Sequence, residues 1–141
     1  MATLQEQILA HLKLALAAVP GVITVERSRK AAFEREETPA IVIRPDAEQD
    51  ERMSQHTDHH TFTALVIVHT RGDPWDLVAD PLVEAVHRIV MRDANLKAMA
   101  LDVRRTAREP EDQEADATAG AYTLHYRFIY LSRADDLSAQ P

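Results

Sequence analysis

Residues 61–70 read Thr-Phe-Thr-Ala-Leu-Val-Ile-Val-His-Thr, and this stretch decides the fold class. From Ala64 to Val68 every side chain is apolar, and three of the five are β-branched. A short β-branched run is typical of a β-strand. Successive side chains of a strand point to opposite faces, so a continuous apolar run predicts a central strand that is covered on both sides.

One helix and two shorter strands are predicted before this stretch. Residues 3–19 carry apolar side chains at three- and four-residue spacing, which indicates an amphipathic helix. Thr3 followed by Glu6 matches a capping box, and a Pro-Gly pair follows the helix. Residues 22–27 alternate weakly as a short strand, and residues 40–43, an Ala-Ile-Val-Ile run between two prolines, predict a buried strand.

A second helix is predicted after the central strand. Residues 71–74, Arg-Gly-Asp-Pro, form a turn in which Asp73 is the expected N-cap, so this turn accounts for the Arg-Gly-Asp tripeptide without a role in cell adhesion. Pro81 falls inside the helix and removes one backbone hydrogen bond. We therefore expect either a kink at Pro81 or a new helix start capped by Asp80. A regular apolar stripe then continues to about Asp93.

The last third of the sequence predicts an antiparallel hairpin. Residues 101–107 alternate as one strand and residues 121–132 as another. The second of these places Tyr122, Leu124, Tyr126, Phe128 and Tyr130 on one face. The whole order predicts an α+β fold: a mixed, mostly antiparallel sheet of about five strands packed by two helices. Residues 1–134 are expected to form a single domain, and residues 135–141 a flexible C-terminal tail.

Composition narrows the functional classes. The chain has 141 residues, no cysteine and a net charge of −7. These values exclude disulfides and a cysteine nucleophile, and they argue against a general nucleic-acid binder. No apolar stretch has the length of a membrane span, so we expect a soluble protein without membrane partners.

The negative charge is concentrated in two segments. Residues 46–60 and residues 108–120 each hold five acidic residues and one basic residue. Both are predicted as long exposed connections, which are either solvated tips or functional loops. The candidate functional residues are the acidic side chains of the second segment, expected to face a neighbouring subunit or a lumen: Glu109, Glu111, Asp112, Glu114 and Asp116.

Motifs for catalysis or cofactor binding are weak throughout. The three glycines lie at predicted turns rather than in a phosphate-binding loop, and no serine has the flanking glycines of a nucleophile elbow. His56, His59 and His60, with Asp58 between them, have some metal-ligand character, but their spacing matches no defined site. We therefore expect no enzyme activity and assign no catalytic, cofactor-binding or metal-binding residue.

Several stretches together resemble a known family. They are the helix of residues 3–19 with its Pro-Gly end, residues 38–43, the 61–70 strand, residues 77–82 entering a helix, residues 96–104 and the final aromatic strand. In pattern and order they resemble the lambda-type tail terminator family, minor tail proteins of long-tailed bacteriophages. Residues 97–99, where the family often has glycine, depart from the pattern.

The resemblance implies a structural role in a phage or prophage. Such a subunit forms a ring, expected to be a hexamer, on the end of the tail tube, stops tube growth and provides the surface to which the head joins. Its partners would be copies of itself, tail-tube proteins and head-completion proteins, and DNA would pass without specific binding. It would be located in the virion tail, and in the host cytoplasm during assembly. The alternative is a small ligand-binding or metal-dependent α+β protein that forms a dimer.

Overall fold

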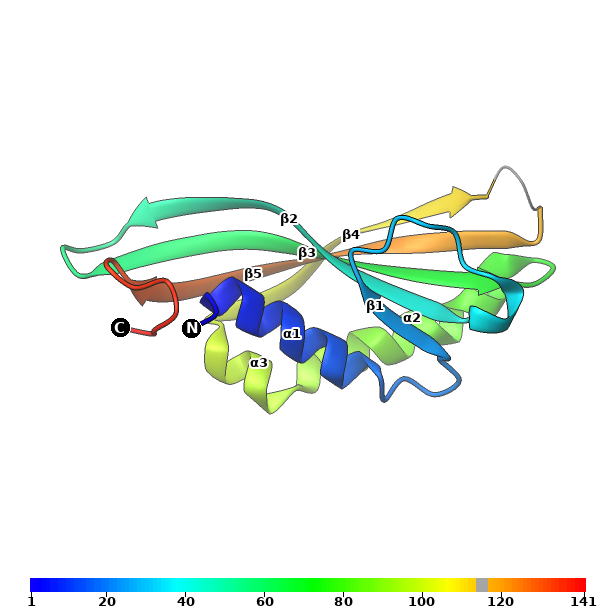
Figure 1. The fold of residues 1–141 in the computed structure, drawn as a ribbon, viewed down its shortest axis with the longest axis horizontal. Helices are drawn as coiled ribbons and strands as arrows, with labels where there is room; N and C mark the ends of the chain where they lie inside the picture. The colour runs from blue at the N-terminus through cyan, green and yellow to red at the C-terminus, as the bar shows by residue number, and fades with distance from the viewer. Residues whose placement is uncertain (114–116) are drawn as a thin grey trace.

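The sheet has five strands with the order β1-β2-β3-β5-β4 (Figure 1). The computed structural model describes residues 1–113 and 117–141. The strands are β1 (Thr24–Arg27), β2 (Ala40–Arg52), β3 (Thr57–Arg71), β4 (Asp102–Asp112) and β5 (Ala119–Arg133). Only the β1–β2 pair is parallel, and the other three pairs are antiparallel. The predicted fold class is confirmed, with the 61–70 stretch inside the central strand β3.

The helices lie along one side of this sheet (Figure 1). They are α1 (Leu4–Leu16), α2 (Trp75–Arg92) and the short α3 (Ala94–Met99), and a 3-10 turn, η1 (Arg35–Glu37), precedes β2. The predicted cap of α1 is confirmed, since the Thr3 side chain accepts a hydrogen bond from the Glu6 backbone N–H. None of the helices in the described ranges is long and apolar enough to span a membrane.

The predicted N-cap of α2 and the predicted alternative of a new helix start at Pro81 are wrong, and a kink at Pro81 stays a prediction. Pro74, not Asp73, is the N-cap residue, and no side chain caps this end. The helix continues through Pro81 without a new start, and the Asp80 carboxylate instead accepts a hydrogen bond from Arg108. The packing of buried residues on both sides of Pro81, such as Ala79 and Leu82, outweighs the lost backbone bond.

The core lies between the helices and one face of the sheet. The even-numbered side chains of β3 from Phe62 to Val68 and of β5 from Leu124 to Tyr130 all point into it. They pack against the buried side chains of α1 and α2. The predicted aromatic face of the last strand is therefore confirmed as core.

The other face of the sheet has no helical layer. The loop of residues 28–38 covers one end of it, where Phe33 packs against Ala40, Val42 and Ile67. The expectation that β3 is covered along both sides by the subunit's own elements is wrong for the rest of this face. The helices form one layer, and that layer packs against the even-numbered side chains of β3 and β5.

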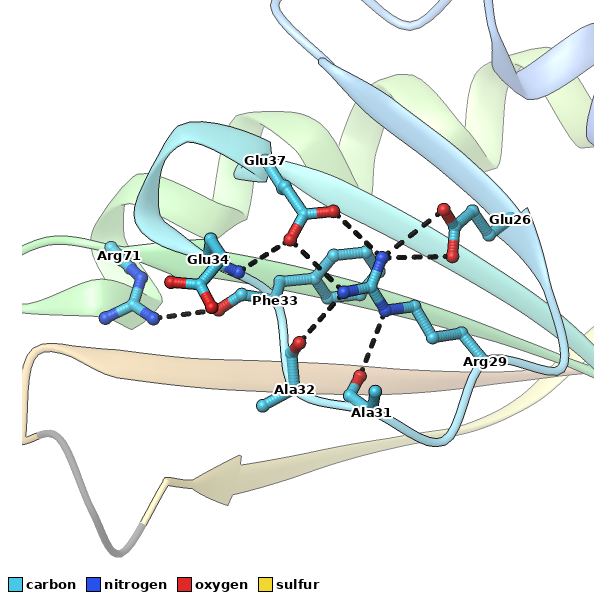
Figure 2. Close-up of polar contacts among 8 residues, drawn as sticks. All are labelled: Glu26, Arg29, Ala31, Ala32, Phe33, Glu34, Glu37 and Arg71. Carbon is cyan, nitrogen blue, oxygen red and sulfur yellow. Dashed lines mark hydrogen bonds and ion pairs between the residues drawn. The ribbon is translucent and has the colours of Figure 1, made fainter.

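A single arginine organises the covering loop (Figure 2). The Arg29 guanidinium donates hydrogen bonds to the carboxylates of Glu37 and Glu26 and to the carbonyl oxygens of Ala31 and Ala32. It also lies over the Phe33 ring, 4.1 Å from its centroid. The loop is thereby fixed on the sheet by contacts that need no second subunit.

Both acidic segments are largely strand rather than loop. β2 and β3 pair as far as Arg52 with Asp58, and β4 and β5 pair as far as Asp112 with Gly120. The prediction that these segments are long connections is therefore wrong, whereas their predicted exposure is confirmed for most of the described residues. The reason is long-range pairing: β3 and β5 are 15 residues each, and they offer backbone partners to polar segments that have no strand signal of their own.

Residues 135–141, predicted to be a flexible tail, make several hydrogen bonds. The Leu4 backbone N–H donates to the carbonyl of Leu137 at 2.8 Å, and the Gln140 side chain donates to the carbonyl of Ala98 at 3.0 Å. These bonds connect the C-terminus to the start of α1 and to α3. The flexibility of these residues stays a prediction.

Candidate assembly surface

The predicted acidic residues that the structure describes lie on the edge strand β4. Glu109 is hydrogen-bonded to His125 of β5, and Asp112 accepts a 2.7 Å hydrogen bond from the Trp75 indole N–H. Glu111 lies between them and is exposed. The other two, Glu114 and Asp116, lie outside the described residues. Whether the group faces a neighbour or a lumen stays a prediction.

The histidine cluster predicted as a weak metal site does not converge. His56 lies in the β2–β3 turn, while His59 and His60 are consecutive in β3 and therefore point to opposite faces. His60 is buried on the helix side, where its Nδ1 lies 2.6 Å from an Asp50 carboxylate oxygen. Its Nε2 lies 2.7 Å from the Ser132 hydroxyl.

Burial and hydrogen bonding shift the pKa values around His60. The hydrogen bond from His60 lowers the pKa of Asp50. Burial raises the pKa of Glu48, which lies beside Asp50 and accepts a hydrogen bond from the Tyr130 hydroxyl. Burial also raises the pKa of Tyr130, whose ring stacks on His60 with 4.7 Å between centroids.

The side chains of this network are hydrogen-bonded in the order of a hydrolytic triad, but a substrate cannot reach the serine. Ser132, His60 and Asp50 are linked in the order of nucleophile, base and orienting carboxylate. The Ser132 side chain, however, is fully buried, and its hydroxyl also lies 3.0 Å from the carbonyl of Arg133. No substrate carbonyl can reach it, so in this fold the network connects β2, β3 and β5.

Three side chains in this network are of types that bind metals. One donor atom each from Glu48, Asp50 and His60 lie within 4.8 Å of one another. Hydrogen bonds within the network already satisfy both imidazole nitrogens. Sequence reasoning missed this group, although the alternation of β3 places His60 on the same side as Phe62, and that of β5 places Ser132 on the same side as Tyr130.

We call the uncovered sheet surface the open face. It consists of outward side chains of β2 to β5 that neither a helix nor the 28–38 loop covers, and these include Arg44, Thr63, Leu65, Asp102, Arg104, Arg127 and Ile129. Leu65 and Ile129 are only partly buried, and Leu65 lies beside Arg44 in the sheet register. The face is therefore a mixture of aliphatic, cationic and acidic side chains, since Asp102 and Glu109 also point outward in the register with β5.

Two arginines of the open face are directly opposite each other. Arg104 of β4 pairs in register with Arg127 of β5. Neither guanidinium forms a hydrogen bond or an ion pair with the residues of ranges 1–113 and 117–141, and the Nε of Arg127 is buried without a partner. Asp102 lies on the same face, two residues before Arg104, and forms no ion pair with either arginine.

One end of the molecule is acidic. The start of β2, the end of β3, the end of β4 and the start of β5 meet there (Figure 1). We call this region the acidic end and define it by four exposed carboxylates, none of which forms an ion pair with a described residue: Glu36, Asp73, Asp76 and Glu111. Two guanidinium groups are also present, and that of Arg71 donates to the carbonyl of Phe33 while that of Arg35 is exposed.

The two long free edges of the sheet are poor templates for strand addition, and the outer strand β1 has only four residues. β1 pairs only with residues 40–43, so the rest of β2 is an edge, and it contains Pro45 and a bulge between Pro45 and Glu48. The edge strand β4 contains Pro110 and a bulge between Arg105 and Ala107. Prolines, charges and bulges on edges prevent pairing with another chain.

Two cavities lie at the surface of the described chain. A groove of about 400 Å³ between α1 and β1 is bordered by Leu14 and Ile23, which are 73% and 63% exposed. A pocket of about 240 Å³ lies beside the 28–38 loop. The Arg29 guanidinium on its wall is already bound by two carboxylates.

Comparison with known proteins gives matches among solved structures. No protein-family model and no curated protein sequence matches the chain. Among solved structures, a chain of the "Virion of native gene transfer agent (GTA) particle" is similar, with 13% sequence identity and a TM-score of 0.45. The match covers 92% of this chain and 92% of that chain. A likeness at this level assigns neither a family nor a function.

Proposed function

We propose that the chain is a structural subunit that assembles with copies of itself into a ring and acts through that assembly, not through catalysis. The observation that carries the proposal is the mismatch around β3. This strand is apolar on both faces, yet helices cover only one of them. Leu65, on the uncovered side, remains partly exposed in the single subunit, and a neighbouring subunit would cover it.

The form of the assembly follows from the asymmetry of the surface. In the described chain, the open face carries unpaired arginines, whereas the acidic end carries unpaired carboxylates. Two copies of the open face would bring arginines together, so the open face does not complement itself. A contact between two different surfaces is heterologous, and heterologous contacts close into rings when the rotation between subunits allows it.

The role of the ring is inferred from the resemblance to phage tail terminators. In this proposal the hexamer sits on the end of a tail tube, stops its growth and offers the surface to which the head joins. The net charge of −7 is compatible with a ring through which DNA passes without adhering, because negative side chains repel phosphates.

Sedimentation velocity and negative-stain electron microscopy of the full chain test this function. The protein is measured alone and with preformed tail tubes of a long-tailed phage, and we expect rings, free or on tube ends. The variant Leu65→Asp should not assemble, because its carboxylate would be desolvated against a neighbour. Leu14→Asp, on the helix side, is the matched control and should assemble normally. A wild type that stays monomeric in both conditions would contradict the proposal.

A further inference from the structure

The two arginines that face each other on the open face have no ion-pair partner among the described residues of the subunit. Like charges directly opposite each other on neighbouring strands destabilise a sheet. Arg104 and Arg127 have this arrangement, and no carboxylate within the described ranges pairs with either of them. A buried guanidinium nitrogen without a partner, such as the Nε of Arg127, adds a further cost. An incoming carboxylate would relieve both.

The same subunit carries carboxylates that are free to approach. The four carboxylates that define the acidic end are exposed and have no ion-pair partner among the described residues. Glu36 lies in η1, Asp73 precedes α2, Asp76 lies in the first turn of α2 and Glu111 lies near the end of β4, whereas Arg104 pairs with Arg127 in the middle of β5. The two surfaces therefore cannot meet within one subunit, but they can meet between two.

We propose that the open face of one subunit binds the acidic end of a second copy, with Arg104 and Arg127 pairing with the carboxylates of Asp76 and Glu111. This inference rests on the proposed self-assembly and identifies the surfaces that carry it. The bulges and prolines on the two long free edges, β4 and the outer part of β2, disfavour strand addition, so the contact is made by side chains of a face. Leu65 and Ile129 supply the apolar part of the contact.

A second copy fits this surface better than a nucleic acid does. The net charge of −7 repels a phosphate backbone, and binding to DNA requires several phosphates to be neutralised together. Only three arginines lie on the open face, and Asp102 lies beside two of them. A few carboxylates can pair with the arginines of this surface, whereas a continuous polyanion would also meet the Asp102 carboxylate.

Two charge-reversed proteins test the proposal. One carries Arg104→Glu with Arg127→Glu, and the other carries Asp76→Lys with Glu111→Lys. Each alone should lose self-association by tenfold or more in sedimentation velocity, because like charges would meet at every contact. An equimolar mixture should assemble again in strict alternation, since each reversed face then meets a complementary end.

The matched control is Arg105→Glu. Arg105 is the residue after Arg104 on β4, is exposed and pairs in register with the inward-facing Tyr126, so it points away from the open face. Its reversal should leave self-association within twofold of the wild type. Urea unfolding of every variant verifies that the subunit itself is intact.

Each outcome separates this inference from the proposed function. A wild type that assembles together with reversed variants that assemble equally well would overturn the inference and leave the ring. A mixture that remains monomeric although the wild type assembles would also overturn it. If the arginine-reversed protein assembles but loses binding to a labelled DNA duplex, the surface is a phosphate site and the inference is wrong. A wild type that never assembles contradicts both.

Discussion

At the scale of single residues, the buried network around His60 is the most specific arrangement in the subunit. Both imidazole nitrogens are hydrogen-bonded, one to β2 and one to β5, so one side chain of the central strand holds both of its neighbours. Buried polar groups that are fully satisfied favour one strand register over others, because a shift by one residue would expose them.

We predict that His60→Ala lowers the free energy of unfolding by about 1–3 kcal/mol, because it leaves the Asp50 carboxylate and the Ser132 hydroxyl without their partner. Urea denaturation measures this. His59→Ala is the control, since the neighbouring side chain points to the other face and has no hydrogen bond to a described residue. Equal losses in the two variants would mean that the network contributes nothing.

The carboxylates of the network predict a pH dependence with opposite signs. Burial raises the pKa of Glu48 above its ordinary 4.5, so the folded protein holds this proton more tightly, and the free energy of unfolding falls as pH rises through the folded pKa. The lowered pKa of Asp50 acts in reverse: its stabilisation is present above 3.8 and is lost as pH falls through the folded pKa.

Glu48→Gln should therefore increase the free energy of unfolding more at pH 7 than at pH 4, because glutamine imitates the protonated carboxyl. Asp50→Asn should decrease it more at pH 7 than at pH 3, because asparagine removes the charge that His60 stabilises. Unfolding curves across this pH range measure both. Parallel pH profiles for the two variants and the wild type would refute the assignment.

At the scale of elements, the contact between α2 and the start of β5 depends on a residue without a side chain, Gly120. A Cβ at Gly120 would lie 2.1 Å from the Trp75 ring, which is nearly buried, packs against Tyr122 and donates to Asp112. We predict that Gly120→Ala costs about 1–3 kcal/mol through overpacking.

Because Trp75 is the single tryptophan, its fluorescence during urea denaturation measures both the stability of the variant and the displacement of the indole. Gly21→Ala is a useful comparison. Nothing lies within 4 Å of a Cβ there, but φ is +85°, so that variant should lose stability without changing the tryptophan emission of the folded state. Unchanged stability and emission in Gly120→Ala would show that the indole moves aside freely.

The elements also show which parts of the fold the sequence predicts. The apolar stripes of α1, β3 and β5 carry their own signal, because the side chains that pack the core are the ones that make the pattern. The outer halves of β2 and β4 carry none, since pairing with β3 and β5 makes them strands. The short helix α3 also depends on a contact that the apolar pattern does not contain, because Asp93 caps it and is hydrogen-bonded to His11 of α1.

The arrangement of the candidate surface is also only partly predictable from local sequence patterns. Glu109, Glu111 and Asp112 are visible in the sequence as charges, but their separation onto two sides of a strand requires the register with β5. The opposition of Arg104 and Arg127 requires the β4–β5 bulge, which shifts the register between Arg105 and Ala107. No local pattern contains a bulge position, so this pair is visible only in the structure.

At the scale of the whole molecule, an acidic subunit must associate against its own net charge of −7. At about 0.1 M salt the screening length is about 10 Å, so repulsion between charges spread over two subunits is already weak. Ion pairs in direct contact are much shorter than this length and remain effective. The attraction between the open face and the acidic end can therefore exceed the general repulsion.

We predict that raising NaCl from about 0.1 M to about 1 M weakens self-association, because the screening length falls to about 3 Å and now reaches the contact pairs. The variant that combines all four charge reversals keeps the net charge and exchanges the two surfaces, so it should show the same salt dependence as the wild type. Sedimentation velocity across the series measures this. Association that strengthens with NaCl would mean that Leu65 and the other apolar side chains dominate the contact, and that the arginine pair does not hold the ring together.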